Sequence, residues 1–229
     1  MEEKIPLVIG RQSTGEETII DLRELPNLFI SYSNDDQLPL LYTSFIQQIL
    51  LLDIPVAFSF SLSSRLAEHI QPLVADKSIL IQFMHATHEA GKINTIVEFV
   101  EALSLEGKRR KALSKMHSPT SKPTPLVVFI DDIFEVLMLP HKKTPLLFIE
   151  LLITGAMQHI YFILGSTGIY RNLLNQIIHV NPSLQRKLKK PVQVLSYNQP
   201  LGAELVMNPD GLLFYRERDE KIHKRLYPM

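Results

Sequence analysis

The stretch Pro125-Leu126-Val127-Val128-Phe129-Ile130-Asp131-Asp132-Ile133-Phe134-Glu135-Val136-Leu137-Met138 decides how the rest of the chain is interpreted. The uninterrupted apolar run from Leu126 to Ile130 is typical of a strand covered on both faces, as the strands of parallel sheets are. That strand ends in two carboxylates, Asp131 and Asp132. Ligands of parallel α/β sheets bind beyond the carboxyl ends of the strands, so both are candidate functional residues. The alternative is helix capping, because a carboxylate before Ile133 suits the free N–H groups of the next helix.

Composition bounds the classes of protein that the chain can belong to. It has 229 residues, 45% of them hydrophobic, and a formal net charge of zero. This is enough to bury the core of one large domain, or of a domain with a small extension. The absence of cysteine excludes a disulfide framework, thiolate zinc sites and iron–sulfur clusters. The charged start, Met1 to Pro6, lacks the apolar segment of a secretory signal, and we expect a cytoplasmic protein.

The longest apolar segment, residues 145–157, is too short to cross a bilayer and carries Glu150 in its middle. We expect a core helix there and no membrane span. Two locally basic runs, residues 108–111 with Lys115 and residues 186–190, indicate either a solvated face or a nucleic-acid contact.

Short β-type runs alternate with helical ones along the chain. The expected strands are 17–22, 27–33, 56–61, 78–83, 126–131, 159–164 and 191–196. Leu38, Leu41, Phe45, Ile49 and Leu52 fall on one helical stripe at spacings of three and four. A second helix is expected over residues 93–116, with Gly107 as a candidate break. The alternation predicts right-handed βαβ crossovers and a doubly wound sheet flanked by helices.

A second strand end has the layout of a phosphate-binding loop without its chemistry. Residues 28–41 are predicted to form a strand, a turn and a helix. Such a loop needs glycines, so that backbone N–H groups converge on phosphate, together with a lysine and a serine or threonine. The segment from Tyr32 to Gln37 contains no glycine.

The order and spacing of these segments resemble the motor domain of the FtsK/SpoIIIE family of DNA-pumping ATPases, nearly from end to end. The resemblance is carried by Ile5 to Arg11, Ser13 to Glu16, Ile19 to Leu22, Pro26 to Ile30, Val127 to Met138, Gly202 to Glu204 and Gly211 to Phe214. It implies a three-layer, P-loop NTPase-like (RecA-like) α/β fold with a mainly parallel sheet flanked by helices. It also implies one motor domain over residues 1–229, with entry strands in 1–25 and the core in 26–229.

The departures from the family pattern concentrate at the nucleotide site. Leu38 stands at the position of the family's phosphate-binding lysine, and Pro39 at that of its magnesium-binding serine or threonine. Asp35 and Asp36 replace loop residues that would face the triphosphate; each carboxylate near a phosphate adds repulsion of about 1 to 4 kcal/mol. We expect Asp35 or Asp36 to cap the helix that begins near Leu38. The family's sensor glutamine is missing from residues 163–168.

These departures favour a catalytically inactive pseudo-ATPase that serves as a scaffold or assembly subunit of a DNA-translocation, conjugation or secretion system. Asp131 and Asp132 are then vestigial metal carboxylates, and no cofactor is expected. The expected partners are proteins, such as related motor subunits or a homo-oligomeric ring. Two alternatives remain: a nucleic-acid-binding module, and an ATPase with a non-standard site for ATP and Mg²⁺. The turn Gly165-Ser166-Thr167-Gly168 is the candidate anion site of the second alternative.

His85 and His88 lie three residues apart, which does not match the common helical zinc spacing, and no metal is expected. Residues 117–125 are expected to form an exposed connector.

Overall fold

The structure is a computed structural model that describes residues 4–32, 37–74, 81–84, 89–115, 123–141, 143–167, 203–208, 213–217 and 224–227. The strands are β1 (Pro6–Arg11), β2 (Glu17–Asp21), β3 (Asn27–Ser31), β4 (Ala57–Ser61), β5 (Ile81–Met84), β6 (Leu126–Ile130), β7 (Ile160–Ser166), β8 (Ala203–Met207), β9 (Leu213–Glu217) and β10 (Lys224–Leu226). The helices are α1 (Gln37–Leu50), α2 (Ser64–Val74), α3 (Glu89–Lys115), α4 (Ile133–Leu137), α5 (Thr144–Thr154) and the 3₁₀ helix η1 (Gly155–Gln158).

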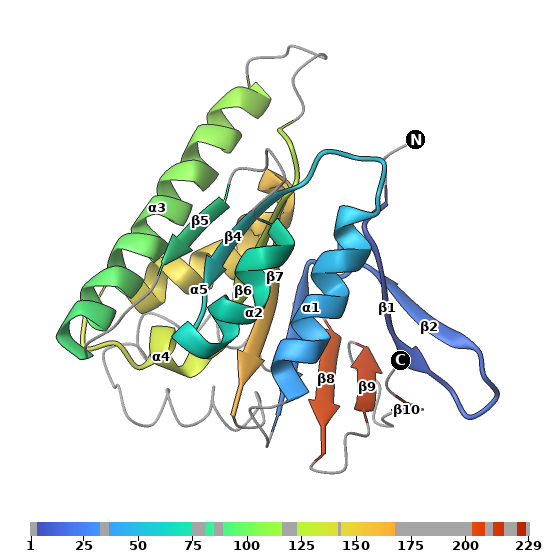
Figure 1. Cartoon of the computed structure of the whole chain (residues 1–229). Coiled ribbons are helices and arrows are strands. Elements are labelled where there is room, and N and C mark those ends of the chain that lie inside the picture. Colours follow the sequence, from blue (N-terminus) through green and yellow to red (C-terminus); the bar gives the residue numbers. More distant parts are fainter. Residues whose placement is uncertain are drawn as a thin grey trace.

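One large sheet organises the chain, and its described strands lie in the order β10-β9-β8-β3-β7-β6-β4-β5. Every neighbouring pair from β8 to β5 is parallel, whereas β8–β9 and β9–β10 are antiparallel. The strand β7 therefore lies between β3 and β6, so that the two predicted strand ends are separated by one strand (Figure 1). The expected α/β fold with a mainly parallel sheet is confirmed.

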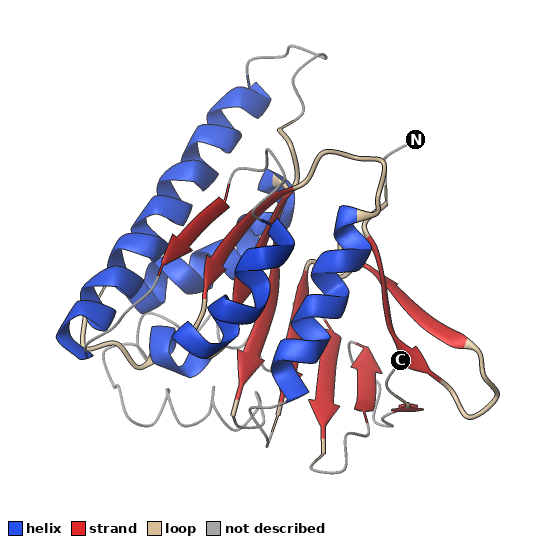
Figure 2. Ribbon diagram, viewed as in Figure 1, coloured by secondary structure: helices blue, strands red, loops and turns tan. Residues whose placement is uncertain are grey.

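Helices cover both faces of this sheet and give the fold three layers (Figure 2). One core joins α1 and α2 to the sheet through residues such as Phe45, Ile70 and Phe129. The other joins α3, α4 and α5 to the opposite face through residues such as Phe99, Val128 and Phe148. Val128 and Phe129 belong to different cores because successive side chains of a strand point to opposite faces.

The long helix α3 corrects one expectation. It continues without interruption through Gly107, which was the candidate break. A glycine inside a helix costs only about 1 kcal/mol, so packing decides the outcome. A Cβ atom at Gly107 would overlap the side chain of Gln158 and approach Leu151, and its absence lets α3 lie close to α5 and η1.

The apolar segment of residues 145–157 forms α5 and most of η1, as a core helix should. Phe148, Leu151 and Leu152 are buried, and Glu150 points to solvent. No helix in the described parts of the chain is long and apolar enough to cross a membrane.

The strands β1 and β2 form a separate two-stranded antiparallel sheet. Its β1 edge is occupied at two points. The amide of Gln48 in α1 bonds both backbone groups of Val8: its Oε1 accepts from the Val8 N–H at 2.7 Å, and its Nε2 donates to the Val8 carbonyl at 3.2 Å. Further along β1, Arg11 and Tyr227 exchange a pair of backbone hydrogen bonds of 3.0 and 2.7 Å. The hairpin is therefore tied to both α1 and Tyr227, the residue that follows β10.

Candidate functional site at the carboxyl edge of the sheet

The carboxyl ends of β3, β7 and β6 meet at one edge of the sheet. Ser31 of β3 lies beside Ser166 of β7, and Ile130 of β6 lies beside Leu164. Asp131, which follows β6, is therefore brought close to the end of β7, and Tyr32, which follows β3, lies on the other side of it. This is the edge at which α/β sheets bind ligands.

The Asp131 side chain is held by the segment that follows β4. Its Oδ2 atom accepts a hydrogen bond from the backbone N–H of Ser63, and its own backbone N–H donates to the Ser61 carbonyl at 3.2 Å. Burial raises the pKa of Asp131 above the ordinary aspartate value, hydrogen bonds from Ser63 act in the opposite direction, and the charge of Glu135 raises it further. Burial and a neighbouring acid both disfavour the charged form of an aspartate.

Asp132 has the structural role that was its alternative interpretation. It is the N-cap of α4, and its Oδ1 atom accepts a hydrogen bond of 2.9 Å from the backbone N–H of Phe134. Its backbone is extended, with φ −136° and ψ 99°, as an N-cap residue requires. The capping interpretation of Asp132 is thus confirmed by its geometry.

Two tyrosines, neither of them predicted from the sequence, complete this edge. The hydroxyl of Tyr42, a fully buried residue of α1, donates a hydrogen bond of 2.6 Å to the carbonyl of Ile130. The hydroxyl of Tyr32 donates to the next carbonyl, that of Asp131, at 3.1 Å. Burial raises the pKa of Tyr42 well above its ordinary value, and the charge of Asp131 adds to this, so the phenol remains a hydrogen-bond donor.

The predicted anion turn lies at the end of β7. Gly165 and Ser166 are the last residues of that strand, Thr167 follows it, and Gly168 lies outside the described residues. A Cβ atom at Gly165 would overlap the carbonyl oxygen of Asp131 and lie 3.1 Å from the Tyr42 hydroxyl. Close packing between β7 and the end of β6 therefore requires this glycine.

Leu38 and Pro39, the two described residues at the predicted phosphate-loop positions, belong to the first turn of α1 and are both buried. Pro39 fits there because the first turn of a helix does not need its N–H. Asp35 and Asp36, and with them their predicted capping role, lie outside the described residues, as do His85 and His88.

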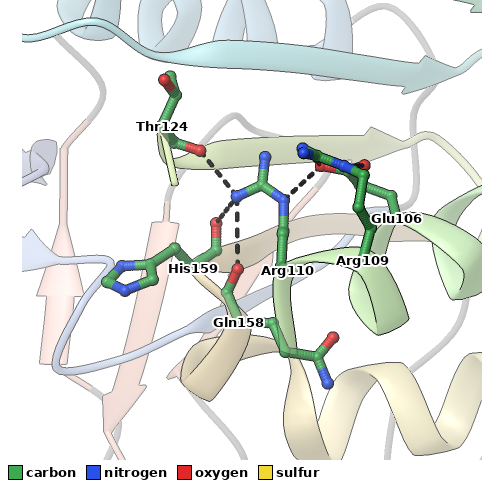
Figure 3. A network of polar contacts seen from close by, with 6 residues as sticks. All are labelled: Glu106, Arg109, Arg110, Thr124, Gln158 and His159. Atoms are coloured by element: carbon green, nitrogen blue, oxygen red, sulfur yellow. Dashed lines mark hydrogen bonds and ion pairs between the residues drawn. The ribbon is translucent and has the colours of Figure 1, made fainter. Parts of the chain in front are cut away.

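Two of the five residues of the first basic run, Arg109 and Arg110, are engaged in intramolecular contacts (Figure 3). Arg109 forms a two-pronged ion pair with Glu106, with both distances 2.7 Å. Arg110 is 4% exposed and lies 2.7 Å from the same carboxylate. It also donates to the carbonyls of Thr124 at 2.7 Å and of Gln158 and His159 at 3.3 Å. Arg110 is therefore a buried structural residue and part of neither a solvated face nor a nucleic-acid contact. The second run, residues 186–190, lies outside the described residues.

In the described parts of the chain, no three His, Cys, Asp or Glu side chains gather as metal ligands do.

Comparison with known proteins places the fold but not a family. No family model and no curated protein matches the chain. Among solved structures, the cytoplasmic domain of the Thermomonospora curvata type VII secretion ATPase EccC matches with a TM-score of 0.62 and 14% identity. The pCW3 conjugation coupling protein TcpA, in its monomer form with ATPγS, matches with 0.60 and 12%, and the cytoplasmic domain of EssC with 0.55 and 10%.

Each alignment covers 99% of this chain. The chain spans 26% of the EccC chain, 67% of the TcpA chain and 44% of the EssC chain. At such low identity the comparison establishes the architecture alone. The chain shares with these three structures a three-layer, P-loop NTPase-like fold with a mainly parallel sheet.

Proposed function

We propose that the chain is a catalytically inactive, FtsK/SpoIIIE-like pseudo-ATPase that serves as a scaffold or assembly subunit in a secretion, conjugation or DNA-translocation system. The solved structures that share its fold include a type VII secretion ATPase and a conjugation coupling protein, which supports a role in a related system. The observation that carries the proposal of inactivity is the burial of Leu38 and Pro39 in the first turn of α1.

Phosphoryl transfer depends on positioned charge. In P-loop enzymes a lysine and the backbone of the loop hold the phosphates, and a serine or threonine hydroxyl holds Mg²⁺. Leucine cannot neutralise a phosphate, and proline offers neither a hydroxyl nor an N–H. Leu38 belongs to the hydrophobic core and Pro39 is buried in the first turn of α1, so neither position presents a side chain that could hold a phosphate or Mg²⁺.

The carboxylates at the end of β6 support the same interpretation. Asp132 uses one oxygen as a helix cap, and Asp131 uses one to accept from the Ser63 N–H. Asp131 and Asp132 do not fit a magnesium-nucleotide site without rearrangement, because each already uses a carboxylate oxygen within the chain and both would repel a phosphate.

The ion pairs of the first basic run weaken the nucleic-acid alternative. Arg109 and Arg110 belong to one of the two basic runs on which that alternative rested, and both are paired with Glu106. A guanidinium that is neutralised within the chain contributes little to phosphate binding.

The proposal is tested by titrating the protein with Mg-ATP in a calorimeter, with magnesium chloride alone as the control. We expect no heat of binding up to millimolar nucleotide and no change in the thermal unfolding midpoint. A ligand at 100 times its dissociation constant would stabilise the fold by about 2.7 kcal/mol. A micromolar dissociation constant with such stabilisation would refute the pseudo-ATPase and favour the non-standard nucleotide site.

A further inference from the structure

Helix α1 is attached to the sheet by a side chain that reaches two neighbouring strands, β6 and β7. The Tyr42 hydroxyl lies 2.6 Å from the Ile130 carbonyl of β6 and 3.5 Å from the Ile163 carbonyl of β7. Its ring meets that of Phe129 edge to face, with centroids 5.2 Å apart and planes inclined by 70°. The residue is fully buried, so breaking the shorter hydrogen bond would leave a carbonyl without water to replace it.

Tyr32 continues the same attachment from the end of β3. Its hydroxyl donates a hydrogen bond to the Asp131 carbonyl at 3.1 Å, and its backbone N–H donates to the Ser166 carbonyl at 2.9 Å. Two consecutive carbonyls, those of Ile130 and Asp131, are thus each bonded by a phenol from a different element. The Asp131 carbonyl in turn rests against Gly165, where a side chain would push it away.

We propose that Tyr42 and Tyr32 form a hydroxyl clasp that fixes α1 and β3 to the carboxyl ends of β6 and β7 without a nucleotide. In P-loop enzymes the bound nucleotide and its Mg²⁺ bridge the phosphate loop, which precedes the first helix, and the carboxylate that follows the metal-binding strand. The clasp connects the corresponding elements of this chain through permanent side-chain contacts. It deepens the proposed function, because its meaning as a substitute for nucleotide rests on that proposal.

The chemistry of the phenols suits a permanent contact. Burial and the nearby charge of Asp131 keep the Tyr42 hydroxyl protonated, and a carbonyl oxygen cannot change its charge. The clasp therefore has no step at which hydrolysis or a proton would release it. We therefore expect α1 and β3 to stay attached to the carboxyl ends of β6 and β7 under conditions in which a nucleotide-driven motor would open this edge.

Amide hydrogen exchange of the full chain tests the clasp, using Tyr42→Phe, Tyr32→Phe and the double variant. Each change removes one hydroxyl and keeps the ring. We expect exchange to accelerate at least tenfold in α1 and at the ends of β6 and β7, most in the double variant, with β9 unchanged. The control is Tyr227→Phe, since Tyr227 is 39% exposed and follows β10, which β9 and β8 separate from β3 in the sheet; we expect it to exchange like the wild type.

Unchanged exchange in α1 would overturn the clasp, and so would an equal acceleration in every strand, which indicates global destabilisation alone. The result is independent of nucleotide binding. If the wild type bound Mg-ATP, the pseudo-ATPase proposal would fail, whereas the location of the accelerated amides would still decide whether the clasp exists.

Discussion

The amino and carboxyl edges of the central sheet both gather backbone carbonyls, but they use different chemistry. At the amino edge, the guanidinium of Arg110 donates to the carbonyls of Thr124, just before β6, and of His159, just before β7 (Figure 3). At the carboxyl edge, the phenols of Tyr32 and Tyr42 donate to the two carbonyls at the end of β6, those of Asp131 and Ile130. One edge is held by a buried cation and the other by neutral hydroxyls.

The comparison shows that the buried positive charge, that of Arg110, lies at the amino edge of the sheet. A site for a triphosphate needs cations at the carboxyl edge, where the sheet's ligands bind. The buried arginine lies at the opposite edge, and Glu106 neutralises it there. The side chains that directly follow β3 and β6, those of Tyr32, Asp131 and Asp132, carry hydroxyl and carboxylate groups, which can hold strands together but cannot neutralise phosphate.

The largest expected effect comes from removing the buried cation. Arg110→Met removes a donor from three carbonyls, of which only that of His159 keeps a second donor, the Leu126 N–H, and should lower the free energy of unfolding by about 3 kcal/mol. Urea denaturation followed by circular dichroism measures the loss. The matched control is Arg109→Met, which breaks an ion pair with the same Glu106 carboxylate at an exposed position and should cost less than about 1 kcal/mol. Equal losses in the two variants would contradict the structural role of Arg110.

A smaller effect is expected from adding one methyl group at the carboxyl edge. Gly165→Ala places a Cβ atom against the Asp131 carbonyl, which is backbone and cannot turn aside. We expect a loss of about 2 kcal/mol from overpacking, measured by the same denaturation experiment.

The control for this variant is Gly107→Ala, whose new Cβ atom meets the far end of the flexible Gln158 side chain. Alanine also gains about 1 kcal/mol in helix propensity over glycine, so the net change should be close to zero. A neutral Gly165→Ala would show that β6 and β7 separate easily at this edge.

The smallest effect concerns the charge of Asp131. Because burial raises its folded-state pKa above the unfolded value, the group's contribution to stability falls as the pH rises through that window. Asp131→Asn should therefore be more stable than the wild type at pH 7, by about 1.4 kcal/mol for each unit of the pKa difference. The gain should vanish below the ordinary aspartate value of 3.8.

Thermal unfolding from pH 3 to 8 measures this profile. The control Asp132→Asn should change stability by less than about 0.5 kcal/mol, because asparagine caps a helix as well as aspartate does. A wild type that is more stable than Asp131→Asn at pH 7 would show that the Asp131 carboxylate is stabilised by a partner such as a cation.

The sequence predicted most of the sheet because its strands are short apolar runs that need no alternation. The runs that became β3, β4, β6 and β7 were expected within two residues at each described end. The helix α2 was not named, although Leu66, Ile70 and Val74 repeat every four residues and are all buried. That periodicity was a usable signal for an amphipathic helix.

The site was predicted in part. The two aspartates that follow β6 could be located from the apolar run before them, and the cap role of Asp132 from its place before a helix. The tyrosines could not be found in this way, because Tyr42 meets a carbonyl 88 positions away in the chain. The structural role of Arg110 could not be predicted either, since the sequence of a basic run does not distinguish a buried arginine from an exposed one.

Gln48 satisfies both backbone groups of Val8, as an adjacent strand would do, and Tyr227 does so for Arg11. Exposed strand edges are templates on which other chains aggregate. Gln48 thus blocks the addition of another strand at Val8, because it already occupies the hydrogen-bonding groups that such a strand would need. It also links the N-terminal hairpin to α1, so that a movement of one is transmitted to the other.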